Sequence, residues 1–274
     1  MKILKTPWEK DFIELIKNSK TNIRATSPYI KENICNKIVD AKNKETNFKL
    51  ITSFKIKHIH NRSLDIAGLE TLINNNSTVK NITNLHSKIY VFDDKLAVIS
   101  SSNLTNGGLL KNYEYGILLN EKKIVHEIID DFEQLFTDNK TGTITIKNLM
   151  VAKEILNELQ KTSTTNIYEP QSYDEIIDND VIEIESNQII EVLSGWKKDV
   201  FKIVNSLSHQ HFGLNDIYRY EQYLSKKHPK NNNIKDKIRQ QLQELRDLGL
   251  IEFLGNGKYR KLWKAKTSIQ DQID

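Results

Sequence analysis

The residues best suited to chemistry lie close together in one stretch of the chain. His86 and Lys88 are separated by one residue, and Asn103 follows within a Ser-Ser-x-Asn segment. The apolar residues between them are mostly β-branched, a composition typical of buried strands. Because side chains two positions apart share one face of a strand, we expect His86, Lys88 and Tyr90 to project together from a rigid sheet. Asn103, after the next apolar run, can bring an amide to the same edge.

This grouping suits attack on a phosphate. A histidine nitrogen is a competent nucleophile toward phosphorus and titrates near neutral pH. Lys88 and Asn103 supply N–H donors for the two non-bridging oxygens, where charge develops in the transition state. A carboxylate such as Glu114 can fix the tautomer of the imidazole. No cluster of carboxylates with metal-like spacing lies nearby, so we expect the chemistry to need neither a metal nor another cofactor.

The spacing of these residues resembles the HKD motif of the phospholipase D superfamily. The motif reads His86-x-Lys88-x4-Asp93 and, after six residues, Ser100-Ser101-x-Asn103. The family normally has glycine where this chain has Ser100. The resemblance covers residues 1–148 and extends toward the branch containing phospholipase D-like nucleases through Leu104-Thr105, Gly107-Gly108, Asn112 and Glu114. It implies a catalytic set made of His86, Lys88, Asn103, Ser101, Glu114 and Asp93.

The resemblance also implies a role for each of these residues. One His86 attacks phosphorus to give a phosphohistidine, and a second His86 protonates the leaving oxygen and then activates water. Lys88 and Asn103 hold the phosphoryl oxygens, while Ser101 and Glu114 support and orient the imidazoles. Asp93 is expected to fix local structure and to take no part in proton transfer.

The chain holds only one such motif. The stretch His228-x-Lys230 is followed by Asp236, one residue too far along, and the other histidines lack the lysine partner. The family's active site uses two motifs. The resemblance therefore implies a homodimer that forms through the catalytic domain and shares a two-fold site.

Strand-like and helix-like patterns alternate in the first half of the chain. We expect helices at 7–17, 31–44, 64–74, 124–136 and 147–159, and strands at 23–27, 48–52, 86–92 and 112–120. This alternation is typical of α/β proteins. Together with the resemblance, it predicts an α/β phospholipase D-like domain, with a mixed sheet flanked by helices, over residues 1–160.

Charge is segregated along the chain, although the overall net charge is only +4. The net charge is +5 over residues 1–150, −7 over 151–200 and +6 over 201–274. Two basic blocks on either side of an acidic connector suit two modules that face a polyanion. We expect an acidic linker or arm at 161–190, a second domain at 191–266 and a short tail at 267–274.

The second domain has the pattern of a small winged helix-turn-helix. Helices are expected at 196–207, 215–227 and 234–248, followed by a hairpin with a Gly255-Asn256-Gly257 turn. Residues 196–264 resemble the winged-helix domain of some restriction endonucleases, including methyl-directed enzymes that cut modified DNA. Arg and Gln on an exposed helix can read base edges, and basic residues on a wing can contact phosphates. The expected DNA-binding residues are Asn231, Asn233, Lys235, Lys237, Arg239, Gln240, Gln241, Lys258, Arg260 and Lys261.

The remaining features of the composition favour an ordinary soluble protein. No run of 18 apolar residues and no signal-peptide pattern is present, so we expect a cytoplasmic protein that does not bind membranes. Cys35 is the single cysteine, which excludes an internal disulfide and a zinc finger and favours a buried apolar role.

The sequence as a whole favours a metal-independent DNA endonuclease, of the type II restriction kind, acting on double-stranded DNA. An RNA nuclease would use the same catalytic residues, because a phosphohistidine route needs no 2′-hydroxyl. A phospholipase would need a lipid-binding surface, and no amphipathic membrane helix is visible. A DNA-binding regulator with a silent catalytic fold is disfavoured by the intact motif.

Overall fold

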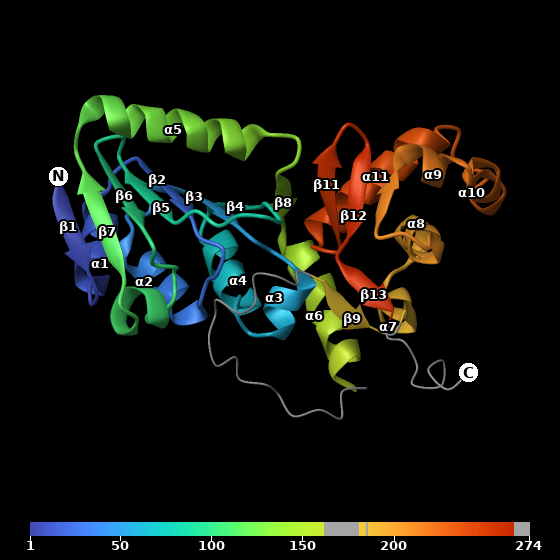
Figure 1. Cartoon of the computed structure of the whole chain (residues 1–274), viewed down its shortest axis with the longest axis horizontal. Helices are drawn as coiled ribbons and strands as arrows, with labels where there is room; N and C mark the ends of the chain where they lie inside the picture. The colour runs from blue at the N-terminus through green and yellow to red at the C-terminus, as the bar shows by residue number, and fades with distance from the viewer. Residues whose placement is uncertain (162–180, 185, 266–274) are drawn as a thin grey trace. The chain divides into compact units, whose positions relative to one another are not determined.

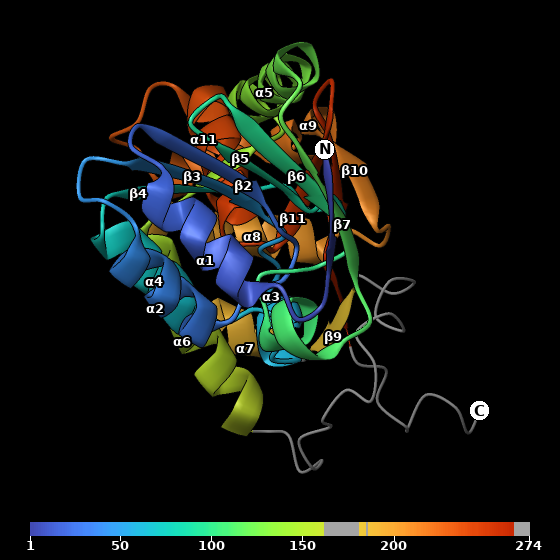
Figure 2. The ribbon, with the colours of Figure 1, turned by 90° about the vertical axis from the view of Figure 1, so that its left-hand side faces the viewer.

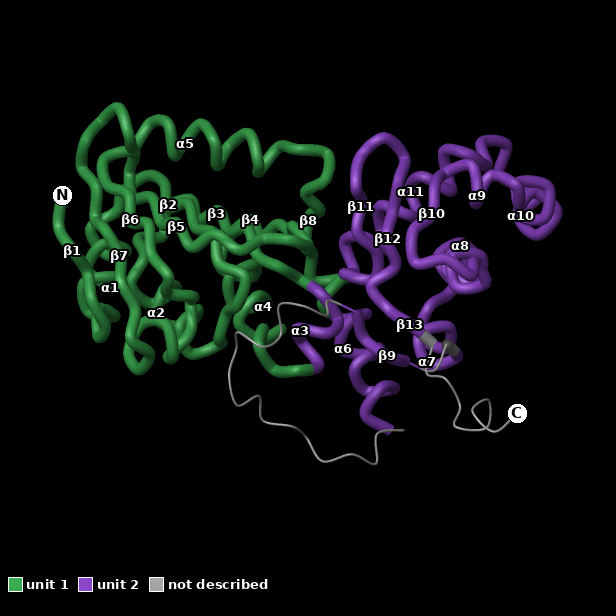
Figure 3. The backbone as a smooth tube through the Cα atoms, in the orientation of Figure 1, with its two compact units in different colours: residues 1–54, 61–149 green, residues 55–60, 150–274 purple. Residues whose placement is uncertain are grey.

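The computed structural model of the chain describes residues 1–161, 181–184 and 186–265. It divides into two compact units, shown in different colours in Figure 3. Unit 1 holds residues 1–54 and 61–149, and unit 2 holds residues 55–60 and everything from residue 150 onward.

Unit 1 is built on one eight-stranded sheet with the order β1-β7-β6-β5-β2-β3-β4-β8. Its strands are β1 (Lys2–Lys5), β2 (Asn22–Thr26), β3 (Asn47–Thr52), β4 (Ser77–Asn81), β5 (Ile89–Phe92), β6 (Leu96–Ser100), β7 (Tyr115–Leu119) and β8 (Gly142–Ile144). Strands β2, β3 and β4 run parallel, and the other neighbours are antiparallel. The predicted mixed sheet is confirmed.

Helices cover both faces of this sheet (Figures 1 and 2). Helices α1 (Glu9–Asn18), α2 (Glu32–Ala41) and α4 (Ile66–Asn74) lie on one face, and α5 (Lys122–Thr137) crosses the other. The apolar stripe of α5 packs on the sheet through Val125, which meets Val91 and Ala97, and through Phe132 and Phe136, which meet Ile51. Burial of such side chains is the main force that holds the layers together.

Shorter elements complete the unit. A π-helical turn, η1 (Gly107–Lys111), follows the motif segment, and α6 (Ile146–Lys161) runs across the boundary between the units at residues 149 and 150. The short helix α3 (Ile56–His60) belongs to unit 2. Cys35 is buried against α4, where its Sγ lies next to Gly68, so the expected apolar role of this cysteine is confirmed.

Unit 2 contains the predicted winged helix. Its elements are β9 (Ile182–Ile184), α7 (Ser186–Val192), α8 (Gly195–Ser206), β10 (His211–Gly213), α9 (Leu214–Tyr218), α10 (Glu221–Lys227), α11 (Ile234–Asp247), β11 (Ile251–Gly255), β12 (Lys258–Lys261) and β13 (Trp263–Ala265). Strands β10, β12 and β11 form an antiparallel sheet, and β13 pairs with β9 in parallel. The helix expected at 215–227 is two helices, with a break at Arg219 and Tyr220.

The acidic linker expected at 161–190 lies mostly outside the described residues. Its last part contributes β9 and the start of α7, and Asp178, Asp180 and Glu185 fall in the parts that are not described. The compact units divide at residue 150, ahead of the boundary expected at 160. In the described part of the chain, no helix has both the length and the apolar character needed to cross a membrane.

Candidate active site and nucleic-acid interface

His86 and Lys88 lie just ahead of β5 and not within it. The strand begins at Ile89, so the expectation that His86, Lys88 and Tyr90 share one strand face is wrong. Tyr90 is buried, and its hydroxyl donates to the carbonyl of Ser102 over 2.7 Å. The His86 side chain is exposed, and Lys88 Nζ lies 2.8 Å from the carbonyl oxygen of His86. The imidazole therefore stands on a loop at the sheet edge and is open to a substrate.

Hydrogen bonds to the Thr26 hydroxyl and from the backbone of β6 hold this loop at the end of the sheet. Thr26, the last residue of β2, accepts from Ile89 N and from the Ser87 hydroxyl, each over 3.0 Å. Ser100 N, at the end of β6, donates to the Lys88 carbonyl over 3.0 Å. Ser87 and Lys88, which follow His86, are thus held by β2 and β6, the two strands on either side of β5.

Asn103 is positioned from the end of β2 and from η1. The Ser27 hydroxyl lies 3.4 Å from Asn103 Oδ1 and accepts from Leu104 N over 3.0 Å. Gly108 comes so close that a Cβ there would lie 2.4 Å from the Asn103 carbonyl oxygen and 2.6 Å from its nitrogen. Only glycine permits this approach, because real Cβ contacts are longer. The backbone around Asn103 is therefore held at the same end of the sheet as Lys88.

Ser101 and Glu114 form a bonded pair at the adjoining strand ends. The Ser101 hydroxyl donates to Glu114 Oε2, and Ser101 N donates to the Tyr115 carbonyl over 3.0 Å. Glu114 N in turn donates to the Thr6 hydroxyl over 3.0 Å, which ties the residue to the end of β1. Within one chain the Glu114 carboxylate contacts Ser101, not His86. The expected role of Ser101 and Glu114 in orienting the imidazoles therefore stays a prediction.

Ser100 replaces the glycine of the family motif without disturbing the strand. It faces Gly116 in the β6–β7 ladder, and a Cβ at residue 116 would lie 3.1 Å from Ser100 Oγ. The Ser100 hydroxyl donates to the Tyr115 carbonyl and accepts from Ser102 N, over 3.1 and 3.0 Å. The residue without a side chain at this pair is thus Gly116 on β7, opposite Ser100.

Asp93 lies in the turn at the other end of β5, away from His86. Asp93 and Asp94 have positive φ values of 49° and 54°, and with Lys95 they form the three-residue loop between the paired residues Phe92 and Leu96. The Asp93 carboxylate accepts from Lys20 N and Thr21 N over 2.7 Å and from Asn22 N over 3.1 Å. Partial burial raises its pKa, but these donors outweigh that effect and hold the pKa below its ordinary value. The contacts support the structural role expected for Asp93.

Sequence reasoning missed the residues that hold the site. Thr6, Thr26 and Ser27 contact the motif only after folding, because they come from strand ends far from it in the chain. Gly108 was part of the resemblance, but its close approach to the Asn103 backbone was not foreseen. A weak signal existed, since Thr26 and Ser27 close a strand just ahead of Pro28. Polar residues at strand ends are common, however, and the pattern alone does not say which of them reach the motif.

In unit 2 most of the expected DNA-binding residues have accessible side chains, and two have buried ones. Most are exposed or half-buried on α11, the turn before it and β12: Asn231, Asn233, Lys235, Lys237, Arg239, Gln240, Lys258 and Arg260. The other two are buried, with 3% of Gln241 and 8% of Lys261 exposed, so they do not lie on the exposed surface with the rest. Gln241 lies on the apolar stripe between Ile238 and Leu245, and Lys261 shares the inner face of β12 with Tyr259.

Contacts within unit 2 fix several of the exposed cations. Arg239 Nη1 donates to the Tyr218 hydroxyl over 2.8 Å, and Lys235 Nζ lies 5.5 Å from the centroid of the same ring. Arg260 Nε donates to Glu252 over 2.7 Å, across the β11–β12 ladder. Lys258 is exposed beside the wing turn. The exposed cations on α11 and the wing make this surface suited to phosphate contacts.

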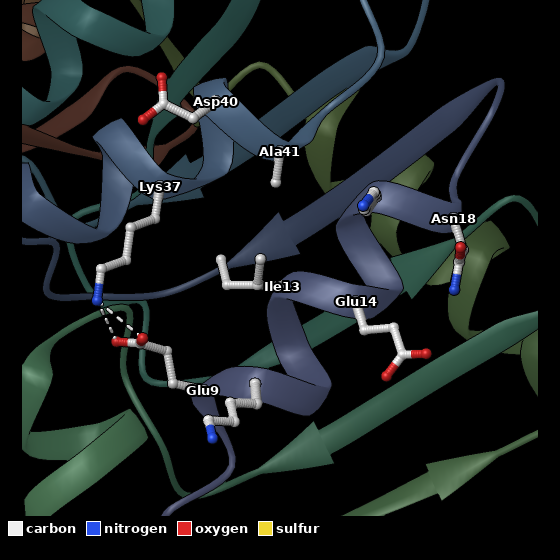
Figure 4. A pocket seen from close by; sticks show the side chains of 9 residues that line it. Glu9, Ile13, Glu14, Asn18, Lys37, Asp40 and Ala41 are labelled. Carbon is white, nitrogen blue, oxygen red and sulfur yellow. Dashed lines mark hydrogen bonds and ion pairs between the residues drawn. The ribbon is translucent and has the colours of Figure 1, made fainter.

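A separate groove in unit 1 lies between α1 and α2 (Figure 4). It has a volume of about 760 Å³ and carries charges of both signs, including a Lys37–Glu9 ion pair of 2.8 Å. The motif residues do not line it. Among the residues that the structure describes, no three His, Cys, Asp or Glu side chains form a group suited to a metal ion.

Comparison with solved structures finds similar folds at low sequence identity. NucT from Helicobacter pylori is 13% identical with a TM-score of 0.42, and the match covers 49% of this chain and 94% of NucT. Nuc from Salmonella typhimurium, a phospholipase D family member, is 18% identical with a TM-score of 0.40, over 48% of this chain and 91% of Nuc. Polyphosphate kinase from Porphyromonas gingivalis is 17% identical with a TM-score of 0.40, over 54% and 24% of the two chains.

Comparison with protein families finds two matches, one in each part of the chain. Residues 12–136 match the family described as "Cardiolipin synthase, PLD-like domain", which includes every motif residue from His86 to Glu114. Residues 193–261 match the family described as "Dam-replacing HTH domain", which spans α8 to β12. The chain therefore carries a phospholipase D-like domain followed by a winged-helix domain of the Dam-replacing helix-turn-helix family.

Proposed function

We propose that this protein is a DNA endonuclease of the restriction type that cleaves phosphodiesters without a metal, through a phosphohistidine. The observation that carries the proposal is the convergence of strand ends around the motif. Lys88, Ser101, Asn103 and Glu114 are bonded to the ends of β2, β6, β7 and β1, and His86 stands exposed beside them. A winged helix with exposed cations in the same chain supports double-stranded DNA as the substrate.

In the proposed reaction, the exposed imidazole of His86 forms a bond to phosphorus and the leaving oxygen takes a proton from a second His86. Water then attacks the phosphohistidine and releases the product. Lys88 and Asn103 donate to the non-bridging oxygens, and their backbone anchoring means that little reorganisation is needed as charge develops. Each chain supplies one His86, so the reaction needs two chains.

The proposed homodimer has a suitable surface on the sheet of unit 1. Ile3, Ile117 and Ile99 are aligned across β1, β7 and β6, and they are 61%, 43% and 45% exposed. Ile99 leads directly into the Ser100–Asn103 segment of the motif. A continuous row of exposed isoleucines favours burial against another apolar surface, and a second copy would bring the two motifs together.

The test is cleavage of plasmid and phage DNA, modified and unmodified, by the full chain in excess EDTA. The wild type should give discrete fragments, and the His86→Ala variant should give none. His126→Ala is the matched control, because His126 is exposed on α5 and bonded to the Lys122 carbonyl, and it should cut normally. Loss of cutting in EDTA would refute the phosphohistidine route. Binding without cutting by the wild type would refute the nuclease, and cleavage of RNA alone would refute DNA as the substrate.

A further inference from the structure

A second pocket lies in unit 2, at the end of β12 away from the wing turn. It has a volume of about 470 Å³, which falls within the usual range for small-molecule sites. Its walls come from the end of α8, the loop at residues 207–210, Lys261 of β12, and Trp263 and Lys264 of β13. No carboxylate is among its lining residues.

The unusual feature of this pocket is the buried ammonium group of Lys261. The residue is only 8% exposed, and Nζ donates to the Leu207 carbonyl over 2.7 Å. An ammonium group has three donors, and for the described residues that carbonyl is the only acceptor within hydrogen-bonding distance of Nζ. Burial lowers the pKa of Lys261, because a charge removed from water is destabilised. A buried cation without a counter-ion is costly, and a bound anion would remove that cost.

The other residues around the pocket fit an anion as well. Lys264 and His209 are exposed and line the opening, so they can add positive charge or N–H donors. Trp263 Nε1 donates to Asn205 Oδ1 over 3.0 Å, and Gln210 Nε2 donates to backbone carbonyls of β12 and β13. These bonds hold the walls in place. The Trp263 ring is itself buried, at 2% exposed, and stacks on Phe201 with the ring centroids 4.7 Å apart.

We propose that this pocket binds a phosphate-class oxyanion, with Lys261 as its buried counter-charge and Lys264 and His209 at its opening. The oxyanion has two possible sources, a free phosphate-bearing molecule or a backbone phosphate of bound DNA. The site is distinct from the exposed cations of α11 and the wing. Lys258 lies three residues back along β12, about 10 Å away at the rise of a strand, and faces the opposite side of the sheet.

The first arm of the test uses inorganic phosphate with the full chain, with chloride at the same ionic strength as the reference. Tryptophan fluorescence and the melting temperature are followed, since Trp263 lines the pocket. The wild type should show saturable binding, and Lys261→Met should bind at least about tenfold more weakly. Lys264→Gln should also weaken binding, whereas Lys202→Met, at an exposed residue of α8 that does not line the pocket, should not change it.

The second arm separates the two sources. The same variants are titrated with a short DNA duplex at several salt concentrations. If Lys261→Met weakens DNA binding and reduces the salt slope by about one, the anion is a backbone phosphate. If DNA binding is unchanged while phosphate binding is lost, the anion is a free molecule. The proposal is overturned if the wild type shows no saturable phosphate effect and Lys261→Met binds DNA normally. If Lys261→Met fails to fold, the same phosphate and DNA titrations are read from Lys264→Gln. Lys264 is exposed, so its substitution should not disturb folding.

Discussion

At the scale of single residues, Ser100 and Asn103 fit their places because the glycines that face them have no side chain. Ser100 fits where the motif normally has glycine because Gly116 faces it, and Asn103 is reached by η1 because Gly108 has no side chain. Thr26 and Ser27 each make two hydrogen bonds that hold motif residues. The imidazole of His86, the proposed nucleophile, makes no side-chain hydrogen bond to the residues that the structure describes. This leaves it room to approach phosphorus.

Asp93 gives a prediction at the residue scale. Its folded pKa lies below its ordinary value of 3.8, so its hydrogen bonds stabilise the fold above that pH and are lost as the pH falls through the folded pKa. Asp93→Asn should lower the free energy of unfolding by about 1–2 kcal/mol at pH 7, because its amide NH₂ would meet backbone N–H groups. The difference from wild type should shrink as the pH falls below 3.8 and through the lower folded pKa of Asp93.

Denaturant unfolding at several pH values measures this effect, and Asp130→Asn on the exposed side of α5 is the control. DNA cleavage at pH 7 should be unaffected by Asp93→Asn wherever the variant stays folded. A loss of activity without a loss of stability would show that Asp93 acts in catalysis.

At the scale of elements, η1 is the part that the sequence did not reveal. Gly108→Ala would place a Cβ against the Asn103 backbone, so we expect a loss of stability of about 2 kcal/mol or more and a larger loss of cleavage, because Asn103 would move. Gly107→Ala is the matched control, since its Cβ would meet only the Asn112 side chain, at 3.2 Å. Thermal unfolding and initial cleavage rates give the comparison. Equal effects of the two variants would contradict the role given to Gly108.

The wing gives a second prediction at this scale. Lys258→Ala should weaken binding to all DNA sequences about equally and reduce the slope of log affinity against log salt by about one, as loss of one phosphate contact does. Gln241→Leu should leave DNA affinity unchanged, because Gln241 is buried. Fluorescence anisotropy with duplexes of several sequences tests both variants. A sequence-dependent loss in Lys258→Ala would show that this residue reads bases.

Helices with an apolar stripe could be predicted from the sequence, but the contacts between separate elements could not. The apolar stripes of α1, α2, α4, α5, α8 and α11 show a clear helical period, and the structure has a helix at each place. Strands β1, β4 and β8 were missed because they are short and polar, and they become strands only by pairing. The period that found α11 also places Gln241 on its apolar stripe, and alternation along β12 separates Lys261 from Lys258. Both corrections were therefore available in the sequence pattern.

At the scale of the whole molecule, one chain supplies one histidine to the proposed reaction, which needs two. The exposed isoleucines of β1, β7 and β6 lie on the sheet that ends in the motif, so dimerisation and assembly of the active site would be one event. The Glu114 carboxylate bonds Ser101 in the single chain. The orientation of the imidazole would then be completed only after the second chain binds.

Ile117→Lys tests this arrangement. The side chain is 43% exposed in the single chain, so the substitution should change stability by less than about 0.5 kcal/mol while it disrupts the dimer and abolishes cleavage. Leu254→Lys, at a residue 40% exposed on β11, is the control and should leave the dimer intact. Sedimentation of both variants over a range of concentrations gives the result. A wild type that is monomeric wherever it cuts DNA would refute the shared site.

The bond between Thr6 and Glu114 joins residues 108 positions apart in the chain. Strand β1 leaves the ribosome before its partner β7, which emerges only after most of unit 1 has been made. The carboxylate of the proposed site is therefore fixed late in synthesis, and the unfinished chain cannot hold a complete set of catalytic groups. For a protein proposed to cut DNA in the cell that makes it, this order of assembly would keep nascent chains inactive. It also means that a change at the first six residues, such as a fused tag that pulls β1 away, would act directly on the active site.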